Sequence, residues 1–222
     1  MNQMEIIHFS AFGLNLQEPM ALAFNWLIAS VCFVAFFTVK NNHSEEIKSW
    51  RKFFLFFGLS TFVGGLGHIF FQYFGIYGKF PHWIGGIISA FYAGNAMLYR
   101  LENIKLQKNL KLILIVKGFV FLGLALTLKN FIFIAVDAII TYLFYCGIIG
   151  FKFCKKGVAG MSFIVMGVMI CIPAAFVYIL KINPSIWFNM DDLSHVFMVA
   201  CIFFFYLGVK NLSTETHKLE TA

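Results

Sequence analysis

The stretch FIFIAVDAIITYLFYCGIIGF, residues 131–151, decides the class of this protein. It carries a single charged side chain, Asp137, and it is as long as the run of about 20 apolar residues that an α-helix needs to cross a bilayer. Six further apolar runs flank it, at 19–39, 53–76, 81–101, 110–128, 158–180 and 186–209. The chain therefore predicts one domain, residues 1–222, with the fold of an all-α membrane protein, a bundle of seven transmembrane helices.

The composition supports lipid as the solvent of this bundle. Of the 222 residues, 60% are hydrophobic and only 12% are charged, which is more apolar surface than a soluble domain of this length can bury. The formal charge of +7 does not indicate a nucleic-acid partner, because the basic residues form short clusters beside apolar runs, as membrane topology requires. A membrane lipid is the expected substrate or ligand, and nothing in the sequence indicates an oligomeric state.

Basic residues predict the direction of the chain, since the loops on the cytoplasmic side of a membrane carry an excess of Lys and Arg. Three residues of this kind lie in the links on one side, namely Lys79, Lys129 and Lys181. Thirteen lie on the other side, namely Lys40, Lys48, Arg51, Lys52, Arg100, Lys105, Lys108, Lys111, Lys152, Lys155, Lys156, Lys210 and Lys218. We therefore expect the N-terminus outside and the C-terminus in the cytoplasm, in the plasma (inner) membrane of a bacterium.

Ionisable groups within the spans are the candidates for function, because each is costly to hold in a bilayer. With a rise of about 1.5 Å per residue, His68 is expected about 12 Å below the outer end of the second helix, and His195 about 13 Å below the outer start of the seventh. Asp191 precedes His195 by four residues and so shares its helix face. These three side chains are predicted to meet at one depth.

Four other polar residues are predicted in the outer third of the bundle, and each has a structural alternative. Asp137 is either neutral, paired with a histidine or in the pocket, and Asn25 enters the first helix at a similar depth. His82, beside Trp83, is expected to anchor the third helix at the headgroups. Asp192 suits the positive end of a helix dipole. These residues are pocket candidates with weaker support.

Two further side chains complete the set of alternatives. Lys117 lies about two turns from the cytoplasmic end of its span, so it is expected to snorkel to the interface. His68 follows Gly64, Gly65 and Gly67, small residues that let helices approach closely, and it could therefore serve only as an interhelical hydrogen-bond donor.

His68, Asp191 and His195 form a set that can hold a divalent metal. Two histidines and one carboxylate leave the fourth position of a zinc ion open for water, as catalytic zinc sites do. Zinc lowers the pKa of that water towards 7 and polarises a carbonyl or phosphoryl oxygen, which is the chemistry of a hydrolase. The same three side chains could equally form a hydrogen-bond network without metal.

The segments Val63-Gly-Gly-Leu-Gly-His68 and Asn189-Met-Asp-Asp-Leu-Ser-His195 resemble the superfamily that joins alkaline ceramidases with the adiponectin and progestin receptors. That superfamily has seven helices, a zinc histidine late in the second and an H-x-x-x-H pair early in the seventh. The first span, ALAFNWLIAS at 21–30, also resembles the first helix of the ceramidases. The resemblance implies that His68 and His195 are zinc ligands, that Asp191 replaces a third histidine and that Asp137 at most orients water.

This chain departs from the superfamily at three positions. Asp191 stands in place of the first histidine of the pair, Gly64 stands in place of a serine, and the third span has no aspartate. The leading functional prediction is a zinc-dependent hydrolase of a lipid amide or ester, similar to a ceramidase. Two alternatives remain: a non-catalytic seven-helix lipid-binding or sensing protein, and a proton or small-solute pathway lined by His68, Asp137, Asp191 and His195.

Overall fold

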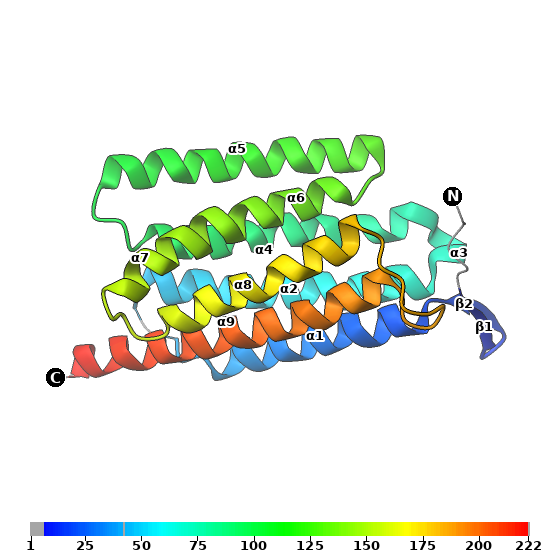
Figure 1. The fold of residues 1–222 in the computed structure, drawn as a ribbon, viewed down its shortest axis with the longest axis horizontal. Helices are drawn as coiled ribbons and strands as arrows, with labels where there is room; N and C mark the ends of the chain where they lie inside the picture. Colours follow the sequence, from blue (N-terminus) through cyan, green and yellow to red (C-terminus); the bar gives the residue numbers. More distant parts are fainter. Residues whose placement is uncertain (1–6, 42, 222) are drawn as a thin grey trace.

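The computed structural model describes residues 7–41 and 43–221 and shows a helical bundle (Figure 1). Seven long helices lie within these residues, which agrees with the predicted all-α membrane architecture. Their bounds are Pro19–Thr38 (α1), Glu45–Ile69 (α2), Phe80–Leu98 (α4), Ile104–Leu128 (α5), Ile132–Lys155, Met161–Ile179 (α8) and Met190–Thr221 (α9). All but α4 are long and apolar enough to cross a membrane, so the chain is an integral multi-pass membrane protein.

The helix over Ile132–Lys155 changes its winding twice. It begins as α6 (Ile132–Ile140), continues as the π-helix η2 (Thr141–Ile149) and ends as α7 (Gly150–Lys155). A π-helix places one extra residue in each turn and is uncommon. Here it starts one turn after Asp137, whose contacts are described below.

The second helix lies earlier in the chain than its apolar run predicted. It begins at Glu45 rather than at residue 53, because acidic residues in a first turn suit the helix dipole although they lie outside the hydrocarbon. It ends at Ile69 rather than at residue 76, and the chain continues as the short helices α3 (Phe71–Phe74) and η1 (Gly75–Lys79). The turn between these two requires a positive φ at Gly75. His68 therefore lies in the last turn of α2, not about 12 Å below its end.

The last helix also differs from its prediction, since α9 begins at Met190 rather than at residue 186. His195 consequently lies in the second turn of α9, and Asp191 and Asp192 lie in the first. Both histidines are thus nearer the end of the bundle than the apolar runs alone indicated.

A β-hairpin precedes the first helix, and its turn explains its register. Strands β1 (His8–Ala11) and β2 (Leu14–Gln17) pair antiparallel, with Ala11 opposite Leu14. The two residues between them, Phe12 and Gly13, both have positive φ, as a two-residue type I′ turn requires. The hairpin places Glu18, the next residue, at the start of α1.

The helices run roughly side by side, with α2 packed between α1 and α4, and α9 packed against α8 and α1 (Figure 1). Helix α5 lies at one edge and contacts α4 and α6. The hairpin and α3 lie at one end of the bundle, here called the hairpin end, and the chain finishes at the other, here called the C-terminal end.

Aromatic side chains fill the half of the bundle nearer the C-terminal end. Trp50, Phe53 and Phe54 on α2 are fully buried, as is Phe205 on α9. Ring centroids of Trp50 and Phe205 are 5.5 Å apart, and those of Tyr142 and Phe205 are 5.6 Å apart, within the range of favourable aromatic pairs. Of the buried polar residues on α1, α2 and α9, Asn25, His68 and Asp192 lie towards the hairpin end, whereas Glu46, Ser49 and Ser213 lie towards the C-terminal end.

Candidate binding site at the hairpin end

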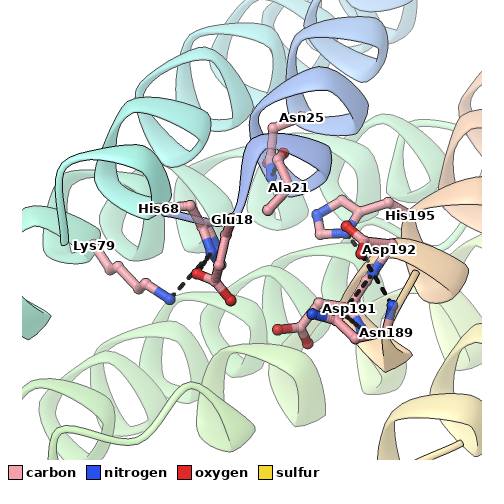
Figure 2. A network of polar contacts seen from close by, with 9 residues as sticks. All are labelled: Glu18, Ala21, Asn25, His68, Lys79, Asn189, Asp191, Asp192 and His195. Atoms are coloured by element: carbon pink, nitrogen blue, oxygen red, sulfur yellow. Dashed lines mark hydrogen bonds and ion pairs between the residues drawn. The ribbon is translucent and has the colours of Figure 1, made fainter. Parts of the chain in front are cut away.

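Glu18 and Lys79 join His68 in a polar contact between three elements (Figure 2). The Oε2 atom of Glu18 lies 2.8 Å from Nδ1 of His68, and Nζ of Lys79 lies 3.2 Å from the same nitrogen. Since an ammonium group only donates and an ionised carboxylate only accepts, Nδ1 can satisfy one of these neighbours at a time. The position of the imidazole proton therefore decides which neighbour is bonded.

The backbone of Glu18 is unusual for a residue at a helix start. It precedes Pro19, which suits the first position of a helix, but it has φ 52° and ψ 56° in the left-handed region and its side chain makes no capping bond to α1. A left-handed conformation is costly for a residue with a side chain. In this conformation the Glu18 carboxylate makes no bond to its own helix and contacts His68 on α2.

Burial and neighbouring charges shift the pKa values of the two groups beside His68, Glu18 and Lys79, in opposite directions. Burial alone would raise the pKa of the Glu18 carboxyl, but the hydrogen bond and electrostatic attraction of His68, with the charge of Lys79, lower that pKa below its usual 4.5. Burial lowers the pKa of Lys79, and the carboxylates of Glu18 and Asp191 oppose this change. Glu18 is therefore ionised at neutral pH.

The start of α9 carries a reciprocal cap built from Asn189 and Asp192. Oδ1 of Asn189 accepts the backbone N–H groups of Asp191 at 2.8 Å and Asp192 at 3.2 Å, and Oδ2 of Asp192 accepts the N–H of Asn189 at 3.1 Å. This is the arrangement of a capping box. The structural alternative for Asp192, an acidic residue at a helix N-terminus, agrees with this geometry.

One carboxylate oxygen of Asp192 nevertheless has no hydrogen-bond partner among the described residues. The residue is 2% exposed, and its Oδ1 atom is buried without a hydrogen-bond partner among the described residues. Together with Glu18 and Asn189 it lines a cavity of about 10 Å³, enough for about one water-sized group. The remaining lining is mostly apolar, with Ile7, Pro19, Met20, Ala21, Ile186 and Trp187.

His195 lies one turn further along α9 and uses its Nδ1 locally. That nitrogen contacts the backbone carbonyl of Asp191, so it is the protonated nitrogen and donates to this oxygen. Figure 2 shows His195 with Asp191 and Asp192 on one side and His68 with Glu18 on the other. His195 lies within electrostatic range of His68 and Lys79, so the two groups belong to one polar cluster.

His82 and Asn25 pack against α2 beside this cluster. The Nδ1 atom of His82 is 2.9 Å from the Ser60 hydroxyl, which itself donates to the His82 carbonyl at 2.7 Å. Nδ2 of Asn25 donates to the Ala21 carbonyl at 2.8 Å, and its Oδ1 is buried without a partner among the described residues. His82, interpreted from the sequence as a headgroup anchor, is bonded to Ser60 on the neighbouring helix α2.

Gly64 makes room for both of these side chains. A Cβ atom on Gly64 would lie 2.9 Å from the His82 ring and 3.3 Å from Oδ1 of Asn25. The first distance is closer than non-bonded carbon atoms approach. A glycine at this position is therefore required by packing.

Asp137 lies apart from the histidines and is paired with a lysine that the sequence suggested would snorkel. The ammonium group of Lys117 contacts the Asp137 carboxylate and donates to the Asp137 carbonyl and the Thr141 hydroxyl, both at 2.9 Å. These contacts use all three of its donors. Lys117 therefore joins α5 to the start of the π-helix, and Asp137 is held by this lysine rather than by a histidine.

The three predicted metal ligands do not form a metal site in this arrangement. Among the described residues, no group of three His, Cys, Asp or Glu side chains is placed to hold one ion. Nδ1 of His68 is engaged by Glu18 and that of His195 by a backbone carbonyl, so only the Nε2 atoms of the two histidines remain for a metal. Zinc binding by His68, Asp191 and His195 therefore stays a prediction.

Glu18 and Lys79 are the members of the cluster that sequence reasoning missed. Each lies at the border of an apolar run, where a charged residue is ordinary, and neither is near His68 in the sequence. The left-handed conformation of Glu18 leaves no mark in the sequence, although the Glu-Pro pair at 18–19 does indicate a helix start.

Comparison with known proteins gives one family. The model of a family of unknown function (DUF6962) matches residues 20–214. No curated protein and no solved structure matches the chain.

Proposed function

The chain belongs to this family of unknown function, DUF6962, and we propose from its site that it is a membrane sensing protein that binds the ammonium group of a lipid headgroup at the hairpin end. The single observation that carries the proposal is the unpartnered Oδ1 atom of Asp192, buried against a cavity that Glu18 also lines.

Charge supports a cationic ligand. A buried carboxylate oxygen without a donor is costly, and a bound cation or hydrogen-bond donor removes that cost. Asp191 adds a third carboxylate to the cluster, against the single permanent cation of Lys79, which already contacts His68. The cluster therefore has more negative than positive groups and favours a ligand that brings a positive charge.

Size supports a primary ammonium group in particular. The cavity of about 10 Å³ admits about one water-sized group, which an –NH₃⁺ matches and a trimethylammonium group exceeds. Trp187 is part of the same lining, and its indole can attract a cation across its face. The site therefore favours an ethanolamine-type headgroup over a choline-type one.

The surroundings support a lipid rather than a soluble amine. Ile186 and Trp187 line the cavity and are 55% and 58% exposed, and tryptophan is enriched where a protein meets headgroups. The apolar faces of α1 and α9 continue from this end along the bundle. An acyl chain can follow them while its headgroup contacts Asp192.

Native mass spectrometry of the purified protein tests the proposal with three probes: phosphatidylethanolamine, its N-acetylated form and phosphatidylcholine. We expect phosphatidylethanolamine to bind at least tenfold more tightly than the other two, since a hydrogen bond to a charged group contributes about 1.5–3 kcal/mol. Equal binding of the amine and its N-acetylated form would overturn the proposal, because acetylation removes the charge and leaves the rest of the lipid unchanged.

A zinc-dependent lipid hydrolase similar to a ceramidase is the second candidate. One observation favours it: Nδ1 of both His68 and His195 is engaged by an oxygen, which is how a histidine that offers its other nitrogen to a metal is held. Metal analysis of the purified protein, with hydrolysis assays on ceramides and acyl esters, separates this candidate from the sensor. About one zinc per chain, lost in His195→Ala, would favour the hydrolase.

A continuous proton or solute pathway receives less support from the packing. The fully buried rings of Trp50, Phe53 and Phe205 fill the bundle between the polar cluster and the C-terminal end. The polar groups at the hairpin end therefore form a one-sided site, as a sensor or a hydrolase requires.

A further inference from the structure

A second cavity, of about 210 Å³, lies at the C-terminal end of the bundle. Its walls come from the link between α4 and α5 and from the end of α7. Three of the lining residues are cationic, namely Arg100, Lys152 and Lys156, and one is acidic, Glu102. The excess of positive charge predicts an anionic ligand, the opposite of the ligand proposed for the hairpin end.

Arg100 is fixed in place by a buried partner. Its Nε atom donates to Oε1 of Glu46 on α2 at 2.6 Å, and the two side chains are 17% and 11% exposed. A single bond through Nε leaves the other donors of the guanidinium group for a ligand. Glu46 thus holds the arginine rigid, which lowers the entropy cost of binding.

Phe153 contacts two of the cations. The Arg100 guanidinium lies 5.7 Å from the centre of the Phe153 ring, and the Lys156 ammonium lies 5.3 Å from it. Both distances allow cation–π attraction. Lys152 is exposed and makes no ion pair among the described residues, so its charge is also available to the cavity.

The start of α5 adds to the positive potential of this cavity. Asn103 lines the cavity and caps α5, since its Oδ1 accepts the N–H of Leu106 at 3.0 Å. The helix continues for 25 residues, and the N-terminus of such a helix attracts anions.

The cavity lies beside an exposed apolar surface of α5. Leu106 lines it and is 45% exposed, and further along α5 Ile113 and Val116 are also half exposed. With about 210 Å³, the cavity is smaller than the roughly 300–1,000 Å³ of a typical ligand pocket. It can hold a headgroup while the acyl chains lie along α5.

We propose that Arg100, Lys152 and Lys156 bind the phosphate group of an anionic membrane lipid in this cavity, at the end of the bundle opposite the amine site. Basic pockets between helix ends are known lipid-headgroup sites. The lipid would join the start of α5, a helix at the edge of the bundle, to the end of α7.

Native mass spectrometry of the full chain, with phosphatidylglycerol as the probe, tests this proposal. Each lysine near an anionic membrane surface contributes about 1 kcal/mol, so Lys152→Gln/Lys156→Gln should bind the probe about 30-fold more weakly than the natural protein. The matched control, Lys105→Gln/Lys108→Gln, removes two charges from α5 that do not line the cavity and should bind as the natural protein does. Arg100→Lys keeps the charge but loses the planar fork, so it should bind more weakly than the control.

Two results would overturn the proposal. If the test and control variants both bind phosphatidylglycerol equally weakly, its affinity depends only on the total charge of this end of the bundle. Displacement of phosphatidylglycerol by millimolar inorganic phosphate, with no effect of acyl chains on affinity, would assign the cavity to a soluble anion instead.

Discussion

Oε2 of Glu18 lies 2.8 Å from Nδ1 of His68, and this contact joins the first residue before α1 to the last turn of α2, fifty residues further along the chain. Both side chains are little exposed, at 13% and 11%. Because the carboxylate caps no helix, its main described role is this contact. The hairpin end is therefore held together by an ionisable pair.

Glu18→Gln should destabilise the protein at neutral pH and reduce the loss of its stability at acidic pH. The lowered pKa of Glu18 means that its stabilising contribution is present above pH 4.5 and is lost as the pH falls through the lowered value. At pH 7 we expect a loss of about 1–3 kcal/mol, measured by thermal unfolding in detergent. Once the pH is below the lowered pKa of Glu18, the variant and the natural protein should differ little.

The control for this experiment is Glu45→Gln, which removes an exposed carboxylate paired with Lys48 at 2.7 Å. Exposed pairs of this kind contribute little to stability. A Glu18→Gln variant as stable at pH 7 as Glu45→Gln would contradict the structural role of the Glu18–His68 contact.

Lys117→Met should be among the most destabilising single changes in the bundle. It leaves the 1% exposed Asp137 without the ammonium group that holds it, and breaking a buried pair in this way costs about 3–5 kcal/mol. Lys117→Met/Asp137→Leu should recover most of the loss, because no buried charge remains. If Lys117 snorkels instead, the single variant will unfold at the same temperature as the natural protein.

Gly64→Ser should destabilise the protein, because neighbouring side chains already fill the space beside Gly64. The new Cβ would lie 2.9 Å from the His82 ring, and overpacking of this kind costs about 1–3 kcal/mol. Gly123→Ala is the matched control, since a Cβ there meets nothing within 4 Å and alanine is the better helix former. The thermal unfolding temperature should fall in Gly64→Ser and rise in Gly123→Ala.

The proposed orientation predicts which end of the bundle an impermeant thiol reagent reaches. On intact cells, Phe12→Cys at the fully exposed hairpin tip should react, whereas Lys105→Cys at the C-terminal end should react only after permeabilisation. The unsubstituted protein gives the background of the five native cysteines. Labelling of Lys105→Cys on intact cells would contradict the predicted orientation of the chain.

The number of long helices and the gathering of polar groups near one end could be predicted from the sequence, because apolar length and the cost of buried charge are local properties. The contacts within the cluster could not. The pairing of Lys117 with Asp137 depends on the rotation of two neighbouring helices, which periodicity leaves open in an all-apolar span. His68 also lies nearer the end of its helix than the sequence predicted, because α2 ends at Ile69 while the apolar run continues into α3 and η1.

The measurement that tests the central claim most directly is the affinity of Asp192→Asn for phosphatidylethanolamine, beside that of Asp191→Asn. Asparagine at 192 keeps the oxygen that caps α9 but removes the charge of a residue that lines the cavity, whereas Asp191 does not line that cavity. We predict that Asp192→Asn binds the amine lipid at least tenfold more weakly, with its preference over the N-acetylated form lost, and that Asp191→Asn keeps this preference. Unchanged binding in Asp192→Asn would contradict the account.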